Sequence, residues 1–240
     1  MEEMAGRVVS LLVGVVLVLT LGGCGAGEPS STPTGITQTG ADVRERLAAG
    51  LAAVGSDAEM VRDMRTTLTP VEATWLHGWQ VFDLQLSTEY RSSRFYAALS
   101  DDGRTLDLYE SPESFAEMTR SAKVAVNDAS LAVDVGNLYL DVTRDFRKWS
   151  YRIDSLSDVQ WRPDIDSDLD LQQQRADLEA RYADVVQPPT ARASETGWSV
   201  TVWMVYDRSL VRHSLEIAVD GAVQDRPEVV ETDMPVPYSL

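Results

Sequence analysis

The sequence predicts an α+β fold, in which an antiparallel β-sheet made of two three-stranded meanders carries helices packed mainly on one face. Apolar and polar residues alternate with period two in two blocks, over 81–108 and over 200–221. Each block contains an Asp-Gly turn, which is typical of hairpins between antiparallel strands. Capped segments with helical periodicity precede and separate the blocks. We therefore expect a single α+β domain over 41–240.

Two helices are expected before the first block. Asp42 is placed to cap a helix over 43–51, and Asp57 is placed to cap a second one. The apolar residues of the second segment share one helical face: Met60, Val61, Met64 and Leu68. Pro70 then interrupts this helix, because proline lacks the amide hydrogen that a helix interior requires.

The first block predicts three strands. Apolar residues alternate with polar residues over 81–86 and again over 94–99. The turn at 100–103 contains Asp102-Gly103 and leads into a third segment with Leu106 and Leu108. Because the segments are short and joined by turns, we expect a meander.

Capped helices and one strand are expected between the two blocks. Ser111 is placed to cap a helix whose first residue is Pro112, a position that favours proline. Asp128 is placed to cap the next helix, and a strand over 149–153 follows it. The apolar stripe of that helix comprises Leu131, Val135, Leu138, Val142 and Phe146.

A further helix and the second block complete the domain. Asp168 is placed to cap a helix that ends before Pro188-Pro189. Its apolar face comprises Leu171, Leu178, Tyr182 and Val185. Alternation over 200–205 and over 211–219 then predicts two strands, followed by a two-residue turn at Asp220-Gly221. The C-terminal segment predicts an edge strand or an extended tail, because it contains Pro227, Pro235 and Pro237.

The two blocks begin alike. Gly78-Trp79 opens the first, Gly197-Trp198 opens the second, and each is followed by alternating segments and an Asp-Gly turn. This echo favours a degenerate repeat of one helix and three strands, whose halves would contribute to one curved sheet. Two unrelated meanders would give the same pattern.

Residues 1–23 have the composition of an export signal. The run over 8–21 is apolar apart from three residues, a length typical of a signal-peptide core and short for a membrane-spanning helix. Arg7 supplies a positive charge before it. Because two glutamates follow Met1, translation could start at Met4 instead.

The segment Leu21-Gly22-Gly23-Cys24 resembles the lipobox of bacterial membrane lipoproteins, in which small residues precede a cysteine. The resemblance covers only the leader. It implies that Cys24, the only cysteine, is the lipid-attachment residue and carries a diacylglycerol and often an acylated amine. Two or more acyl chains anchor a protein stably to a membrane. The protein is then exported and held at the outer face of the cell membrane. The alternative is an uncleaved signal anchor with an inert cysteine.

Composition constrains the partners of the mature chain. Residues 24–40 are expected to form a flexible tether after the lipidated cysteine, because twelve of the sixteen residues over 25–40 are Gly, Pro, Ser or Thr. The formal net charge of the chain is −17, which repels nucleic acid and anionic lipid headgroups. We therefore exclude a nucleic-acid partner and expect contact with the membrane only through the N-terminal lipid.

The chain lacks the motifs of the common catalytic sites. The nucleophile elbow, the Walker loop, Gly-x-Gly-x-x-Gly and His-Glu-x-x-His are absent. Thiol catalysis and a structural zinc site are excluded in the domain, because no cysteine follows Cys24 and only His77 and His213 are present. No catalytic residue, cofactor or metal ligand is therefore assigned. His213 is in phase with apolar neighbours on its strand, which favours either a general base in a pocket or a histidine bonded to the backbone. His77 is interpreted as a turn or packing residue.

Two further groups of residues have alternative interpretations. Asp164, Asp166 and Asp168 are spaced like the first ligands of an EF-hand loop, but Leu169 and Arg175 replace its glycine and its glutamate. We interpret them as an acidic helix start. Several tryptophans lie on or beside expected strands and either line a ligand pocket or pack in the core: Trp79, Trp149, Trp198 and Trp203.

Together these observations predict a membrane-anchored extracytoplasmic lipoprotein whose domain is a non-enzymatic binding or interaction module of the cell envelope. Its partner would be an envelope protein or a small ligand. The alternative is an envelope hydrolase that uses carboxylates or His213. A third interpretation is an assembly factor without a ligand of its own.

Overall fold

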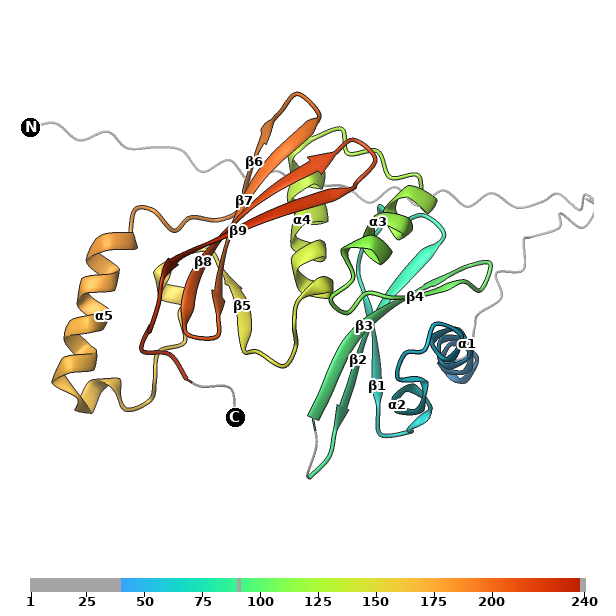
Figure 1. Ribbon diagram of the computed structural model, residues 1–240, viewed down its shortest axis with the longest axis horizontal. Helices are drawn as coiled ribbons and strands as arrows, with labels where there is room; N and C mark the ends of the chain where they lie inside the picture. The colour runs from blue at the N-terminus through green and yellow to red at the C-terminus, as the bar shows by residue number, and fades with distance from the viewer. Residues whose placement is uncertain (1–39, 90–91, 238–240) are drawn as a thin grey trace, which may run out of the picture. The chain divides into compact units, whose positions relative to one another are not determined.

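The computed structural model describes residues 40–89 and 92–237 (Figure 1). Over these ranges the chain forms five α-helices, and its nine strands form two antiparallel sheets. The predicted α+β class is therefore confirmed. Three predicted features lie outside the described residues: the signal peptide over 1–23, the predicted lipid-attachment residue Cys24, and the predicted tether up to residue 39. None of the helices in the described ranges combines the length and the apolar character that crossing a bilayer requires.

The first sheet, sheet A, is a four-stranded meander in the order β1-β2-β3-β4. Its strands are β1 (Thr67–Val71), β2 (Trp79–Ser87), β3 (Ser92–Ser100) and β4 (Thr105–Asp107). The last three are the three predicted strands. The additional strand, β1, pairs antiparallel with β2 along its whole length.

Strand β1 replaces part of the second predicted helix. Asp57 caps α2 (Ala58–Arg62) as expected, by accepting a hydrogen bond from a first-turn amide at 3.0 Å, but the helix has only five residues. Met64 is exposed and Leu68 lies in β1, so the predicted helical face does not continue. Pro70 lies in this edge strand, which tolerates proline because one side of its backbone needs no partner.

Helices cover both faces of sheet A rather than mainly one. On one face, Leu84 and its apolar neighbours pack against α1 (Gly40–Ala53) and α2. On the other face, Val81, Tyr96 and Ala98 join a larger core with α3 (Pro112–Ser121) and α4 (Ala129–Thr143). The reason is that adjacent positions of β2 and β3 are apolar, so both faces of these strands have surface to bury.

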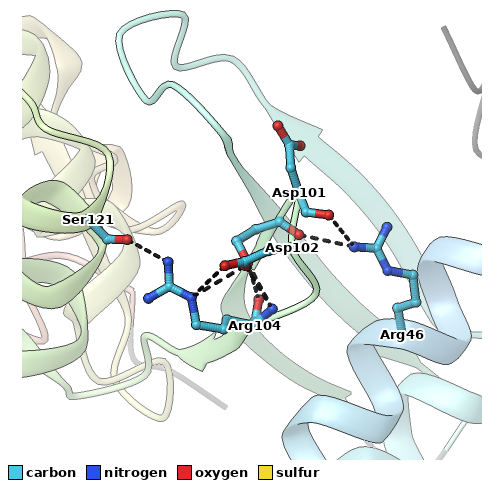
Figure 2. Close-up of polar contacts among 6 residues, drawn as sticks. Arg46, Asp101, Asp102, Arg104 and Ser121 are labelled. Carbon is cyan, nitrogen blue, oxygen red and sulfur yellow. Dashed lines mark hydrogen bonds and ion pairs between the residues drawn. The ribbon is translucent and has the colours of Figure 1, made fainter. Parts of the chain in front are cut away.

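The turn between β3 and β4 connects sheet A to helices on both of its sides (Figure 2). Arg46 of α1 donates hydrogen bonds to the carbonyl oxygens of Ser100 and Asp101, at 3.0 and 3.3 Å. Arg104 pairs with the carboxylate of Asp102 at 3.2 Å and donates to Oγ of Ser121 in α3 at 2.7 Å.

The second sheet, sheet B, has the order β5-β7-β8-β9, and β6 also pairs with β7. Its strands are β5 (Ser150–Ile153), β6 (Thr190–Ala193), β7 (Gly197–Tyr206), β8 (Ser209–Ala218) and β9 (Val223–Glu231). Helix α4 packs on one face, and α5 (Leu169–Tyr182) contributes to a separate core on the other (Figure 1). Short 3₁₀ turns, η1 (Leu156–Asp158) and η2 (Ile165–Ser167), lead from β5 to α5.

The predicted caps of three later helices are confirmed. Ser111 accepts from the amide of Ser114 at the start of α3, and Asp128 accepts from the amide of Leu131 in α4. Asp168 accepts from two first-turn amides of α5, at 3.0 and 3.2 Å. In α1, by contrast, the helix begins at Gly40, so Asp42 lies in its first turn instead of capping it.

The echo between the blocks persists in topology, but the expectation of one curved sheet is wrong. Strands β1–β4 and β6–β9 each form four consecutive antiparallel strands, in separate sheets. Gly78 and Gly197 both adopt positive φ, at 73° and 152°, just before the tryptophan. A Cβ at Gly197 would lie 2.2 Å from the carbonyl oxygen of Ile217, so glycine is required there. The sheets stay separate because α4 packs between them, against β3 on one side and β7 on the other.

Candidate binding cleft

A cleft of about 490 Å³ lies between the C-terminal half of α4 and the adjacent end of sheet B. Most of its lining is apolar, and its volume is in the range of small-molecule sites. Helix α4 supplies one wall, β7, β8 and Asp225 of β9 supply the floor, and the rest of β9 supplies the opposite wall. The residues that face it from these elements are Tyr139, Leu140, Thr143, Met204, Tyr206, Val211, His213, Asp225, Pro227 and Val229.

The position of the cleft follows from a close contact between α4 and sheet B. A Cβ on Gly136 would lie 2.9 Å from Cδ1 of Leu215 and 3.3 Å from Cδ1 of Ile217, so the helix backbone approaches the sheet closely there. One turn further along α4, Tyr139 begins the wall of the cleft. The small residue Gly136 at the contact and the large residues that follow it in α4 therefore determine where the cleft begins.

His213 and Asp225 form a hydrogen-bonded pair in the floor of the cleft. Nδ1 of His213 lies 2.8 Å from Oδ2 of Asp225, and the two side chains are only 11% and 17% exposed. Asp225 lies opposite Leu215 on β8, so the pair is a diagonal one across adjacent strands. In the neutral imidazole whose Nδ1–H donates to this carboxylate, Nε2 is the acceptor.

The pair keeps unused hydrogen-bonding capacity. Nε2 of His213 and Oδ1 of Asp225 are buried and have no hydrogen-bond partner among the residues described. An unsatisfied buried polar atom costs about 1–3 kcal/mol, so a polar group of a ligand at this position would regain a hydrogen bond. The sequence placed His213 on the apolar face of its strand, which is confirmed, but its partner is a side chain and not the backbone.

No nucleophile accompanies His213 in the part of the cleft that the structure describes. The hydroxyl of Thr143 donates to the carbonyl oxygen of Tyr139 within α4, at 2.7 Å. Burial raises the pKa of the Tyr139 hydroxyl to about 12, which keeps it protonated at neutral pH. The arrangement can thus bind and orient a molecule, but it does not assemble a nucleophile and base.

The acids at the rim of the cleft already have partners. Arg147 pairs with Asp145 at 2.9 Å and with Glu110 at 3.2 Å. The hydroxyl of Tyr109 also donates to Asp145, at 3.0 Å. The hydrogen bond from Arg147 lowers the pKa of the Asp145 carboxyl to about 2, so this group is ionised at neutral pH.

Arg144, at the end of α4, also lines the cleft. Its Nη1 donates to the carbonyl oxygen of Ser150 at 2.5 Å, and its guanidinium lies 5.0 Å from the ring centroid of Phe146. Nε is buried and has no hydrogen-bond partner in the described structure. Burial lowers the pKa of this guanidinium, although it remains charged at neutral pH.

The other residues singled out in the sequence lie elsewhere. His77 is exposed in the turn before β2, as expected for a turn residue. Trp79 and Trp203 are buried in hydrophobic cores, so the core-packing interpretation is confirmed for them. Trp198 packs at the edge of a core and donates from Nε1 to the carbonyl oxygen of Val126, and Trp149 is partly exposed against Tyr151.

The acidic stretch before α5 serves as a helix start. Asp168 caps the helix, and Asp164 forms a two-point ion pair with Arg162. Within the described ranges no group of three or more His, Cys, Asp or Glu side chains has an arrangement suited to a metal ion.

A second, polar groove of about 450 Å³ lies on the face of sheet B opposite α4. It is lined by hydroxyl groups of β6, β7 and β8 and by two arginines, Arg192 and Arg212. Arg212 is already paired with Glu228 on β9.

Comparison of the chain with protein-family models, with curated proteins and with solved structures finds no match. Function is therefore argued from the site alone. Sequence reasoning found His213 through its phase, but it missed Asp225 and Arg144, because strand register and the docking of α4 bring them to the cleft. The alternation of Asp225, Pro227 and Val229 along β9 was the available signal for one of its walls.

Proposed function

We propose that this protein is a membrane-anchored extracytoplasmic lipoprotein whose folded unit is a non-enzymatic binding module for a small, mainly apolar molecule. The observation that carries the proposal is the preformed apolar cleft with a buried, incompletely hydrogen-bonded His213–Asp225 pair in its floor. Burial of apolar ligand surface supplies affinity at about 25 cal/mol per Å². The His213–Asp225 pair gives the otherwise apolar lining a fixed polar point.

Access to the cleft supports ligand exchange with the surroundings. Val229 lies on the edge strand β9, opposite Val211, and it is 57% exposed although it lines the cleft. An apolar side chain at such a rim offers a first contact to an apolar molecule. Strand β9 pairs only with β8 among the described strands, so one wall of the cleft is a sheet edge.

Native mass spectrometry tests the binding proposal. The full-length protein would be released from its own membranes with surrounding lipid by a styrene–maleic acid copolymer and examined for a bound small molecule. Val229→Asp introduces a charge at the apolar rim and should abolish the adduct. Val54→Asp is the matched control, because Val54 is also 57% exposed but lies outside the cleft. Absence of an adduct from the wild type, or its equal retention in Val229→Asp, contradicts the proposal.

The anchor is a separate part of the proposal, and it rests on the lipobox-like segment before Cys24. We expect Cys24→Ala to accumulate as unprocessed precursor, whereas Ser31→Ala in the tether is processed normally. Intact mass measurement of the mature wild type should show a diacylglycerol on Cys24. Cleavage of Cys24→Ala after Gly23, or a mature wild type without lipid mass, refutes the anchor.

The hydrolase alternative is favoured by one observation, the His213–Asp225 pair, which resembles a general base with its orienting acid. It predicts that the wild type turns over activated esters and that His213→Gln abolishes this turnover. The native-mass adduct should remain intact in His213→Gln. The binding proposal predicts no turnover above that of buffer for either protein.

A further inference from the structure

We propose that the ligand of the cleft is an amphipathic carboxylate, an apolar chain that ends in one acid group, and that Arg144 is the counter-ion of this acid. The inference rests on the proposed function, because it names the class of molecule that the same cleft takes. It also assigns a specificity-determining role to one residue of the lining.

The charges around the cleft point to a missing anion. The acids in its lining are Glu110, Asp145 and Asp225, and each has a cationic or imidazole partner within 3.2 Å. Arg144 is the remaining charged side chain of the lining. No carboxylate of the described residues forms an ion pair with it, and its Nε has no hydrogen-bond partner.

The neighbouring arginines of Arg144 are already paired with acids, so these pairs leave the charge of Arg144 uncompensated. The guanidinium of Arg94 lies 5.7 Å from the ring centroid of Phe146, which Arg144 also contacts. Arg94 forms a two-point ion pair with Asp83, and Arg152 forms one with Asp141. Asp141, the acid that acts on Arg144, is thus engaged by another arginine. In a chain of net charge −17, an arginine without an ion pair at the end of an apolar cleft is an unusual arrangement.

The shape of the site favours a carboxylate over other anions. A guanidinium presents a planar fork that matches the two oxygens of a carboxylate. A phosphate monoester would bring almost two charges to a single unpaired cation, next to the rim acids Glu110 and Asp145. The C-terminal end of α4 also carries partial negative charge, so the anion would be held through Arg144 alone. The apolar chain would lie along Leu140, Met204 and Val211.

The test compares three probes with the same chain and different head groups: decanoate, 1-decanol and decylamine. Each would be titrated into the full-length protein in phospholipid nanodiscs, with the thermal midpoint of the protein as the readout, because a ligand that binds the native state raises this midpoint. We expect the largest upward shift with decanoate, a smaller one with 1-decanol and the smallest with decylamine.

Two arginine variants make the test specific. Arg144→Met should weaken decanoate about tenfold or more and leave 1-decanol unchanged, which also shows that the variant is folded. Arg62→Met is the control, because Arg62 forms only exposed ion pairs and does not line the cleft. Arg144→Lys keeps the charge and should restore part of the preference for decanoate.

The outcomes separate the inference from the proposed function. If 1-decanol binds the wild type and decanoate binds no better, the carboxylate assignment is refuted and the apolar binding module stands. If Arg62→Met loses as much decanoate affinity as Arg144→Met, the role of Arg144 is refuted. If none of the three probes shifts the midpoint of the wild type, both proposals are refuted.

Discussion

His213 and Asp225 are joined across strands β8 and β9 by a hydrogen bond of 2.8 Å between Nδ1 and Oδ2. The register of the two strands makes the residues diagonal neighbours, and both point to the face of sheet B that α4 covers. The pair fixes two polar side chains at a defined position in the lining of the cleft. The pair also makes the stability of this part of sheet B depend on two residues that are twelve positions apart in the sequence.

Removal of the acid from this pair should destabilise the fold. Asp225→Ala leaves Nδ1 of His213 buried without a partner, and we expect a loss of about 1–3 kcal/mol in the free energy of unfolding. Glu195→Ala, at an exposed position in the turn before β7, should stay within about 0.5 kcal/mol of the wild type. Urea unfolding measures both, and equal stabilities of the two variants would contradict the structural role of the pair.

Two glycines of α1 should respond in opposite ways to alanine. A Cβ on Gly50 would lie 2.3 Å from Cβ of Thr105 in β4, an atom close to the backbone that cannot move aside, so Gly50→Ala should cost about 1–3 kcal/mol or more. A Cβ on Gly40 would have no atom within 4 Å, so Gly40→Ala should be neutral or slightly stabilising. Thermal unfolding distinguishes them. A stabilised Gly50→Ala would mean that α1 does not pack on β4 as described.

Arg44 should contribute far more to stability than its neighbour in the structure, Arg62. Arg44 donates three hydrogen bonds of 2.6 to 3.0 Å to the carbonyl oxygens of Val61, Asp63 and Thr66. These bonds hold α1 against the segment that runs from the end of α2 to the start of β1. Arg44→Met should cost about 2 kcal/mol or more. Arg62→Met removes only exposed ion pairs and should cost less than about 1 kcal/mol. Chemical denaturation of the two variants in parallel is the measurement, and similar losses would refute the difference.

Asp145 should make stability depend on pH in the acid range. The hydrogen bond from Arg147 lowers the pKa of Asp145 from 3.8 to about 2 in the folded state, so the unfolded state binds more protons between these values. The stabilisation is therefore complete above about pH 5 and is lost as the pH falls towards 2. It should amount to about 1 kcal/mol, because Arg147 is 73% exposed.

The variant Asp145→Asn isolates this contribution. Its thermal midpoint should lie below that of the wild type at pH 5, and the two midpoints should converge as the pH approaches 2. A difference that stays constant over this range would show that Asp145 acts by packing and not by its charge.

Local signals predicted the fold better than they predicted the site. The caps at Ser111, Asp128 and Asp168 were predictable because a cap depends on residues within one turn. Strand β1 was missed because Leu68 continues a helical spacing, whereas its pairing with β2 is a tertiary contact. Strand β6 was missed because it has only four residues and only alanine at its apolar positions.

The composition of the cleft depends on contacts that no local pattern encodes. The phase of His213 placed it on the covered face of its strand, but the register of β9 decides that Asp225 becomes its partner. Arg144 follows the last turn of a helix, where a basic residue is ordinary. Only the docking of α4 between the sheets turns it into a charged residue of an apolar cleft.

The strand order of the two sheets has a consequence for how the chain folds. Nearly all strand pairs join neighbours in sequence, and among the described strands the pairing of β5 with β7 is the exception. Short loops close quickly, so each meander can form early and independently of the other. We expect the slow step to be the insertion of α4 between the two sheets. In a hydrogen-exchange experiment during refolding, the amides of β2–β3 and β7–β8 should become protected before those of α4.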